Sequence, residues 1–245
     1  MKNITLLVAF AFLTNFAFAW QPAPGDSLTV WALSGLNLRE NPSQKSKVIF
    51  ALPFGSTVLV EEQDSIRIPF EERICPNPRE DPKRYYTLHG AWLKVNSNGT
   101  LGYIFDFYLS KASSENVQTV FKMGENYTPQ NNLKKYLKEK YGLTSSKNKN
   151  QPSEDKKTKI YVYGSNITLK EVRIGLHDAY ELEVFFPGWR FNEVYLLTNC
   201  FFRLGDDLFY FKKLTATELI ASNEGQGLRI IQNESGCYLY FGSYD

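Results

Sequence analysis

Few residues in this chain have the types and spacing that nucleophilic or metal chemistry requires. A cysteine peptidase needs a nucleophilic Cys beside a His base, and the chain holds three cysteines and two histidines, His89 and His177. Cys200 stands among apolar residues, where a thiol is more often part of a core or a disulfide than a nucleophile. A zinc site needs three or more ligands in a recognisable arrangement, which two distant histidines do not offer. We therefore expect no catalytic residue, no metal site and no cofactor.

Glu181 and Glu183 form the carboxylate pair with the most suggestive spacing. They lie two residues apart, so on a strand their side chains share one face, opposite Leu182 and Val184. Two carboxylates on one face could serve glycoside hydrolysis. The simpler interpretation is the solvated face of a strand, and we favour it over a cell-wall hydrolase.

The first 19 residues have the pattern of a secretory signal peptide. Lys2 supplies a positive charge, an almost wholly apolar stretch runs from Ile4 to Phe18, and Ala17 and Ala19 place small residues before the cleavage site. The apolar stretch is shorter than the roughly 20 residues that a membrane-spanning helix needs. We expect cleavage after Ala19, no transmembrane segment in the mature chain, and an exported protein that is periplasmic or extracellular.

Export would place the cysteines in an oxidising compartment, where disulfides form. Cys75, Cys200 and Cys237 allow three single pairings, and sequence alone does not choose among them. We expect the pair Cys200–Cys237, because both residues stand in segments with strand-like patterns in one predicted domain. Cys75 would then be a free thiol.

The balance of charge limits the partners. The net charge of the chain is +2, or +1 without Lys2 of the predicted signal, which argues against a polycation that binds nucleic acid. The charge is uneven, because residues 131–159 hold nine Lys and three acidic residues. This tract could contact anionic wall polymers or a membrane surface, although a solvated linker and helix face is the commoner arrangement.

Two predicted β-rich regions would hold the side chains of any functional site in position. In the first, Asn98-Gly99 is a strong hairpin turn pair, and the predicted strands are Leu28–Leu33, Val48–Leu52, Thr57–Val60, Ala91–Val95 and Gly102–Phe105. The stretch 62–90 holds four prolines and many charges, with little periodicity. We predict a long insertion there, which is either functional or disordered.

Residues 112–158 are predicted to be a linker that contains one short helix. Thr128 and Pro129 suit the N-cap and the first position of that helix, and Gly142 ends it. Its apolar residues recur at helical spacing: Leu133, Tyr136, Leu137 and Tyr141. Residues 144–157 lack periodicity and are rich in Ser, Lys, Asn and Gln, which indicates a flexible segment.

Residues 159–245 are predicted to form an antiparallel β meander, as a sandwich or a small barrel. The candidate strands, separated by turn residues, are Ile160–Tyr163, Ile167–Ile174, Tyr180–Phe186, Val194–Phe202, Leu208–Phe211, Leu228–Ile231 and Tyr238–Phe241. The expected fold class is therefore mainly β, with a small barrel, a helix-containing linker and a C-terminal antiparallel domain.

Residues 27–111 resemble the bacterial SH3-like family, a small barrel. The resemblance rests on ordered blocks: Leu36-Asn37-Leu38-Arg39, Asn41-Pro42-Ser43, Ser46-Lys47-Val48-Ile49, Leu52-Pro53-Phe54-Gly55-Ser56-Thr57-Val58, Trp92-Leu93-Lys94-Val95, Asn98-Gly99, Gly102-Tyr103-Ile104 and Tyr108-Leu109. The family often directs exported proteins to the cell wall, so the resemblance implies cell-wall peptide or glycan, or a protein, as the partner. The insertion at 62–90 and the lack of an evident wall-cutting enzyme depart from the usual pattern of the family.

Aromatic side chains are the predicted binding residues. Tyr85 and Tyr86, near the end of the insertion, either line a groove or begin the next strand. Trp92 and Tyr108, from the matched blocks, are further groove candidates. Trp189 follows a Pro-Gly turn and is the best candidate for an exposed aromatic side chain in a loop.

These patterns together predict a non-enzymatic binding protein of the bacterial cell envelope. Its SH3-like module would recognise peptide or cell-wall material, and its C-terminal domain would bind a second partner or serve as a structural unit. The alternatives are a cell-wall hydrolase that uses the C-terminal carboxylates, and a secreted protein directed at a host.

Overall fold

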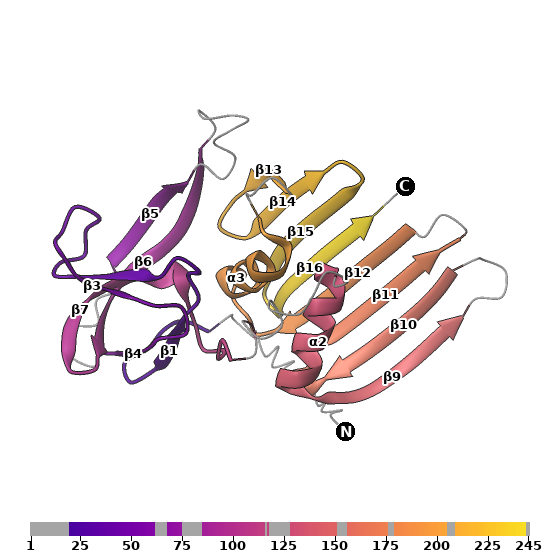
Figure 1. Ribbon diagram of the computed structural model, residues 1–245, viewed down its shortest axis with the longest axis horizontal. Helices are drawn as coiled ribbons and strands as arrows, with labels where there is room; N and C mark the ends of the chain where they lie inside the picture. The colour runs from indigo at the N-terminus through magenta and orange to yellow at the C-terminus, as the bar shows by residue number, and fades with distance from the viewer. Residues whose placement is uncertain are drawn as a thin grey trace, which may run out of the picture.

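The computed structural model describes residues 20–61, 68–74, 85–115, 117, 128–150, 156–175, 179–204 and 209–243. The predicted signal peptide, Cys75, His177 and parts of the predicted insertion and linker lie outside these residues. The described chain forms two sheets of antiparallel strands, and helices α2 and α3 lie against the second sheet (Figure 1). The fold is therefore mainly β, as predicted. None of the helices among the described residues is both long and apolar enough to cross a membrane.

The first sheet curls around an apolar core. Its strands follow the order β3-β2-β7-β6-β4-β1-β8, and β5 pairs with β6. Alternate residues turn inward, so that Leu28, Val58 and Ile104 are buried. The elements are β1 (Ser27–Val30), β2 (Leu36–Arg39), β3 (Val48–Leu52), β4 (Thr57–Val60), β5 (Ile68–Ile74), β6 (Tyr86–Ser97), β7 (Thr100–Phe105), the 3₁₀ helix η1 (Asp106–Tyr108) and β8 (Leu109–Ser110).

The local signals of this region are confirmed. Strands β3 and β4 coincide with the predicted strands, and the predicted turn joins β6 to β7. Asn98 has a φ of 50° and Gly99 a φ of 86°. Two successive residues in the left-handed region are what a tight hairpin turn of type I′ requires, which is why Asn-Gly is found there.

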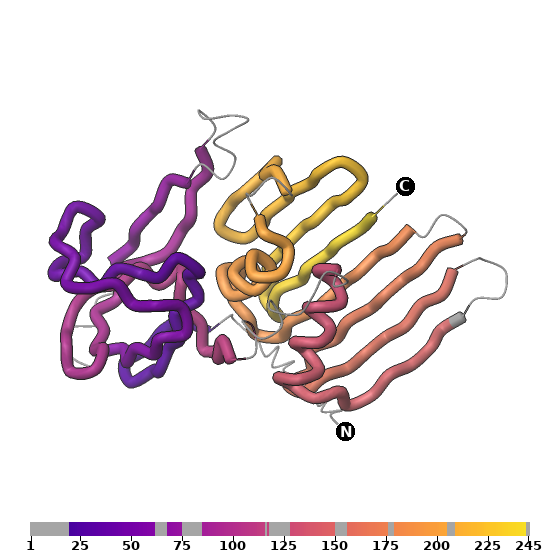
Figure 2. The backbone as a smooth tube through the Cα atoms, viewed as in Figure 1, coloured from indigo at the N-terminus to yellow at the C-terminus, as the bar shows by residue number. Residues whose placement is uncertain are grey.

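The described part of the 62–90 insertion is a β-hairpin arm. Strand β5 pairs with the first half of β6, from Ile68 opposite Trp92 to Ile74 opposite Tyr86. Figure 2 shows the arm rising from the first sheet toward the edge of the second. The sequence predicts a long irregular insertion here because of its four prolines, many charges and little periodicity, and one of these prolines, Pro69, lies in β5. A proline is tolerated in β5 because β6 is the only strand that pairs with it among the described residues.

The second sheet is a single open sheet of two antiparallel meanders. Its strand order is β13-β14-β15-β16-β12-β11-β10-β9. Each helix precedes four strands, and the last strands of the two sets, β12 and β16, pair at the centre of the sheet. The elements are α2 (Pro129–Tyr141), β9 (Leu143–Asn150), β10 (Lys156–Tyr163), β11 (Thr168–Ile174), β12 (Ala179–Pro187), α3 (Phe191–Phe202), β13 (Tyr210–Leu214), β14 (Glu218–Asn223), β15 (Gln226–Asn233) and β16 (Gly236–Ser243). The sequence does not reveal this repeated arrangement.

Helix α2 forms as its capping and spacing predict. It begins at Pro129 after Thr128 and ends before Gly142, whose φ of 67° few other residues adopt. The predicted apolar face is buried at Leu133, Tyr136 and Leu137. The Tyr136 ring packs 5.7 Å from the Phe201 ring of α3, so the two helices share a core on the sheet.

The strand predicted at Val194–Phe202 is wrong, because these residues belong to helix α3. Nearly every residue of α3 is buried, since the helix lies between the second sheet and the first domain. A helix that is covered on most sides has no polar stripe, so its apolar run looks like that of a buried strand. Its length of 12 residues is the local signal that favours a helix.

The flexible segment predicted at 144–157 is also wrong for its described part. Residues 143–150 form the edge strand β9, which pairs with β10 from Tyr163 opposite Leu143 to Lys157 opposite Asn150. The side chains described on β9 are exposed. A polar sequence can form an edge strand because backbone pairing holds it, and lysines at an edge oppose unwanted pairing with other chains.

Glu171 on β11 is a buried carboxylate that ties α2 to the sheet. It is 4% exposed, and its Oε2 lies 3.1 Å from Lys134 Nζ and 3.4 Å from the Tyr161 hydroxyl. The guanidinium of Arg173 lies 3.3 Å from Oε1. Burial alone would raise the pKa of Glu171, but Lys134 and then Arg173 outweigh it and hold this pKa below its usual value.

We expect Lys134→Met to destabilise the protein by about 2 kcal/mol at pH 7, because a charged hydrogen bond to a buried carboxylate is lost. A depressed carboxylate pKa stabilises the fold above the unfolded pKa, and this contribution disappears as the pH falls through the folded pKa. The penalty should therefore shrink on acidification below pH 4. Urea unfolding at several pH values measures it. The control Lys138→Met, exposed on the same helix, should show no such pH dependence; an equal penalty at all pH values for Lys134→Met would contradict the assignment.

Candidate functional site

A groove of about 430 Å³ lies where the first domain meets helix α3. The segment Trp31–Arg39 forms one wall, the β5–β6 arm forms another, and α3 contributes from the second domain. Among the described residues, six aromatic side chains line it: Trp31, Phe70, Trp92, Phe105, Tyr108 and Tyr195. Its size and aromatic lining are those of ligand-binding clefts in proteins.

The aromatic side chains of the groove support one another. The Phe70 ring lies 5.0 Å from the Trp92 ring and 5.0 Å from the Phe105 ring, and it meets Phe105 edge to face. Trp31 is anchored because its indole N–H donates a hydrogen bond of 2.9 Å to the carbonyl of Ala112. Such mutual packing holds the rings in place before any ligand arrives, which lowers the entropy cost of binding.

The groove also has polar side chains, which are Ser34, Asn37, Arg39, Gln44, Glu72 and Asn199 among the described residues. The Tyr108 hydroxyl donates a 2.8 Å hydrogen bond to Glu72 Oε2. Burial and then the negative charge of Glu72 raise the pKa of Tyr108, so the phenol stays protonated and orients the carboxylate. Asn37 and Asn199 add amide groups to the lining. The groove thus offers a carboxylate acceptor, amide groups and the Arg39 guanidinium beside the aromatic rings.

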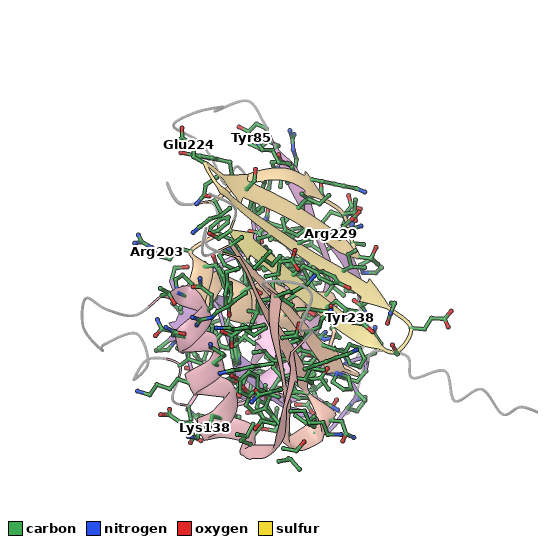
Figure 3. The ribbon with its side chains drawn as sticks, turned by 90° about the vertical axis from the view of Figure 1, so that its right-hand side faces the viewer. Tyr85, Lys138, Arg203, Glu224, Arg229 and Tyr238 are labelled. Carbon is green, nitrogen blue, oxygen red and sulfur yellow. The ribbon has the colours of Figure 1, made fainter. Side chains whose placement is uncertain are left out.

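The structure brings two of the five predicted binding residues into this groove. Trp92 and Tyr108 line it, whereas the other three lie elsewhere. Tyr85 is exposed beside the arm, with the Arg73 guanidinium 4.5 Å from its ring (Figure 3). Tyr86 begins β6, which is one of the two alternatives that the sequence left open, and its hydroxyl donates a 2.5 Å hydrogen bond to the Phe211 carbonyl of the second domain.

Trp189 is not the exposed loop residue that the sequence predicts. It is half-buried and packs 4.9 Å from the Phe186 ring and 6.3 Å from the Tyr141 ring. The Pro-Gly turn before it ends β12, and the chain then folds back over the core toward α3. Turn residues predict a change of direction, but they do not say whether the next side chain faces solvent.

The sequence did not single out Phe70 and Tyr195 as groove residues. Phe70 lies in the insertion, where Ile68, Phe70 and Ile74 are spaced by even numbers of residues, as on one face of a strand. That spacing is the signal that could have revealed β5. Tyr195 belongs to the run that resembles a strand, and no local pattern shows that it meets a different domain.

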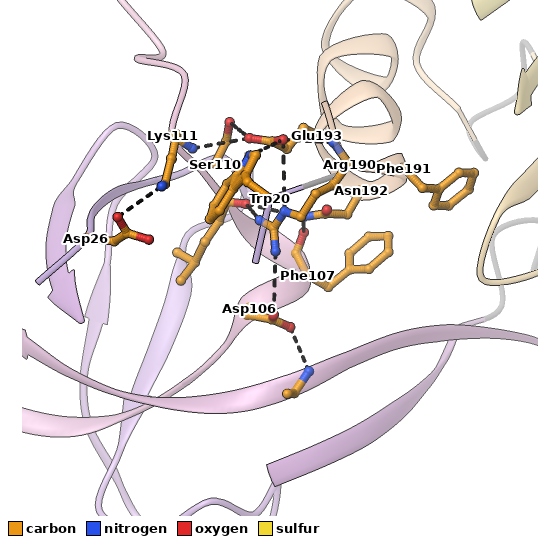
Figure 4. Close-up of polar contacts among 12 residues, drawn as sticks. Trp20, Asp26, Asp106, Phe107, Ser110, Lys111, Arg190, Phe191, Asn192 and Glu193 are labelled. Carbon is orange, nitrogen blue, oxygen red and sulfur yellow. Dashed lines mark hydrogen bonds and ion pairs between the residues drawn. The ribbon is translucent and has the colours of Figure 1, made fainter. Parts of the chain in front are cut away.

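A polar network joins the two domains at the start of α3 (Figure 4). Arg190, at the start of α3, donates from Nη2 to the Leu109 carbonyl at 2.6 Å, and its Nη1 lies 3.6 Å from Asp106 Oδ2. Asp106 in turn accepts from the backbone N–H of Ala91 at 2.6 Å. Asn192 donates to the Phe107 carbonyl at 2.7 Å. These contacts fix α3 against the end of the first domain.

Glu193 completes this network. It accepts hydrogen bonds from the Ser110 hydroxyl at 2.6 Å and from the backbone N–H of Arg190 at 3.0 Å. The second bond, from the backbone of the N-cap residue Arg190 to the side chain of Glu193 at position N3, is one of the two bonds of a capping box. The indole N–H of Trp20 donates to Glu193 Oε2 at 2.8 Å, and the Arg190 guanidinium stacks 4.1 Å from the Trp20 ring. Trp20, the residue after the predicted cleavage site, therefore contacts both Glu193 and Arg190 where the two domains meet.

Cys200 and Cys237 are both buried free thiols, so the predicted disulfide between them is absent from the structure. The sequence pattern places both cysteines in strands, but Cys200 lies on helix α3 and only Cys237 lies on a strand. Burial raises the pKa of the Cys200 thiol to about 12. A thiol with so high a pKa is a poor nucleophile at neutral pH, consistent with its role in the core.

The carboxylates Glu181 and Glu183 lie on β12, on the face of the second sheet that is turned away from the helices. Leu182, which lies between them, and Val184, which follows them, point into the core, as the alternation predicts. Glu183 Oε2 lies 3.6 Å from Lys170 Nζ. Among the described residues, no group of three or more His, Cys, Asp and Glu side chains is arranged to hold a metal ion.

Comparison with known proteins identifies the first domain. The family model of the bacterial SH3 domain matches residues 34–110, which is about a third of the chain. The curated proteins gave no match to the chain, and neither did the solved structures. The matched residues include β2 to β8 and most of the lining of the groove. The resemblance of this part of the chain to the bacterial SH3-like family is therefore confirmed.

Proposed function

We propose that this chain is an exported, non-enzymatic binding protein of the bacterial cell envelope, and that its groove recognises peptide or cell-wall material. The bacterial SH3 domain is a family often involved in cell-wall or peptide binding, and residues 34–110 match it. The observation that carries the proposal is the aromatic groove between this domain and α3. Export is supported by the apolar, Lys-led N-terminal segment that ends in Ala-Phe-Ala.

The chemistry of the groove suits a peptide-like ligand. Aromatic rings accept apolar side chains, and Trp and Tyr are the side chains most often responsible for affinity at binding surfaces. The Glu72 carboxylate, held by Tyr108, is an acceptor for a backbone or side-chain N–H. Asn37 and Asn199 can pair with a peptide group through both their N–H and C=O atoms.

Co-sedimentation of the chain from Trp20 onward with purified insoluble peptidoglycan tests the proposal. We expect wild-type protein to bind, and we expect Phe70→Ala to raise the Kd about tenfold or more, because a packed aromatic side chain of the groove is lost. Phe70 is only partly buried, so the fold should survive this change.

The matched control is Phe50→Ala, which removes an exposed ring on β3 away from the groove, and it should bind as the wild type does. Equal binding by Phe70→Ala would remove the groove as the site. Failure of the wild type to bind peptidoglycan would exclude wall material as the ligand.

A further inference from the structure

Strands β9 and β10 form a strongly basic pair at one edge of the second sheet. Strand β9 lies at the edge that is farther from the first domain (Figure 1). The two strands contain five lysines and no acidic residue: Lys147, Lys149, Lys156, Lys157 and Lys159. The whole chain has 28 Lys and Arg against 26 Asp and Glu, so the rest of the chain carries a net negative charge. The positive charge is therefore concentrated on this basic strand pair.

The lysines of the basic strand pair point to both faces of the sheet. Lys159 stands opposite Glu171 of β11, which faces helix α2, so Lys157 and Lys159 lie on the helix side. Lys147 and Lys149 alternate with them in the register and lie on the outer face. All four of these side chains are exposed. Their ammonium groups therefore surround the edge of the sheet.

The carboxylates of the protein do not neutralise these lysines. Among the described residues, no acidic side chain forms an ion pair with any of the five. Glu171 already shares its single negative charge between Lys134 and Arg173. Lys157 stands directly opposite Arg173, and like charges in directly opposite positions destabilise a sheet. Four cations against one carboxylate give this helix-side cluster of Lys134, Lys157, Lys159, Arg173 and Glu171 a formal charge of +3.

Protection of the sheet edge explains only part of this charge. Lysines on β9 oppose pairing with other chains, as is common at edges. Strand β10, however, is an interior strand that pairs with both β9 and β11, and it carries three of the five lysines. An interior strand has no open edge to protect, whereas an anionic partner would relieve the repulsion between its lysines.

We propose that the basic strand pair binds a linear polymer that carries phosphate groups along its length. A flexible chain can contact lysines on both faces by passing around the edge of the sheet, whereas a flat membrane meets one face at a time. Lysine suits such a partner because its ammonium group is a point charge on a flexible stem. Lys157 and Lys159 stand about 7 Å apart along the strand, so each can contact a different phosphate. The site is separate from the aromatic groove and does not rest on the proposed function.

Titration of the chain from Trp20 onward with long-chain inorganic polyphosphate and with poly(glycerol phosphate) tests the proposal. We expect both polymers to bind, and we expect the logarithm of the Kd to rise linearly with the logarithm of the salt concentration, because binding releases counterions from the polymer. Phosphatidylglycerol vesicles and poly-glutamate are the comparison ligands and should bind more weakly. Lack of binding by both phosphate polymers at low ionic strength would overturn the proposal, as would equal or tighter binding of either comparison ligand.

Charge-removing variants locate the site. Lys159→Gln should raise the Kd about fivefold, and the double variant Lys157→Gln/Lys159→Gln about twentyfold, because each removes one contact to the polyanion. Lys159→Arg keeps the charge and should bind nearly as the wild type does. The control Lys45→Gln, at an exposed position of the first domain, should change the Kd by less than about twofold. Unchanged affinity in the double variant would place the contact elsewhere and overturn the assignment.

Stability provides a readout that a purely structural role of these lysines would not give. Lys157→Gln removes a like-charge pair with Arg173, so it should leave the Tm of the free protein unchanged or raise it. Polyphosphate should raise the Tm of the wild type more than that of the double variant, because only the folded strand pair binds it. A lower Tm of the free double variant would show that the lysines stabilise the fold, and it would contradict the proposal. Phe70→Ala in the aromatic groove should not affect polyphosphate binding, which separates the two sites.

Discussion

Replacement of Arg190 by methionine is expected to destabilise the protein by about 3–5 kcal/mol, because it removes one partner of a buried ion pair. Asp106 is 1% exposed and Glu193 is 3% exposed. Both carboxylates face the Arg190 side chain, at 3.6 and 3.9 Å. Methionine replaces the aliphatic part of the arginine side chain but not its guanidinium, so the loss reflects the unpaired carboxylates and the lost hydrogen bond to the Leu109 carbonyl.

Equilibrium unfolding in urea, followed by tryptophan fluorescence and by circular dichroism, measures this effect. The control Arg229→Met removes the ion pair of Arg229 with Glu218 on the second sheet, in which the Arg229 side chain is 51% exposed, and it should cost less than about 1 kcal/mol. We also expect the two probes to separate in Arg190→Met, because the contacts that couple the domains are weakened. A loss no larger than that of Arg229→Met would show that the junction does not hold the domains together.

Replacement of Phe211 by alanine is expected to cost about 3–5 kcal/mol as well, as do other large aromatic truncations in protein cores. Phe211 on β13 is 1% exposed. Its ring lies 5.5 Å from the Tyr86 ring of the hairpin arm and 6.4 Å from the Tyr195 ring of α3. The change therefore removes a contact that holds both the arm and a groove residue.

The loss of stability should be accompanied by weaker ligand binding in the groove, since Tyr195 and the arm both line it. Urea unfolding and co-sedimentation with peptidoglycan measure the two effects. Phe50→Ala, which truncates a half-exposed ring, is the control and should change stability by about 0.5 kcal/mol or less. A Phe211→Ala protein that is destabilised but binds normally would show that the groove does not need the second domain.

Much of the secondary structure follows from local signals. The pair Asn98-Gly99 predicts its hairpin because few other residues adopt two successive left-handed conformations. Thr128-Pro129 and Gly142 predict the ends of α2 because their backbone preferences match a helix start and a helix stop. Ordered blocks over residues 27–111 predict the first domain, and the family match at 34–110 confirms it.

The errors occur where long-range contacts outweigh local preference. Helix α3 looks like a strand because the two domains bury nearly all of its residues. Strand β9 looks like a linker because its sequence is polar and lacks periodicity. It forms a strand because β10 supplies its backbone hydrogen bonds. Trp92 and Tyr108 were found through the matched blocks, whereas Tyr195 comes to the groove from a helix that is about 90 positions further along the chain.

The sequence by itself therefore determined the β-rich class of the fold, the first domain, helix α2 and the face shared by Glu181 and Glu183. Only the tertiary structure decided that the arm and α3 complete the groove and that Trp20 and Glu193 join the two domains. The physical reason is that turns, caps and alternation depend on neighbouring residues. A site that is built from two domains depends on pairing and packing that no local pattern encodes.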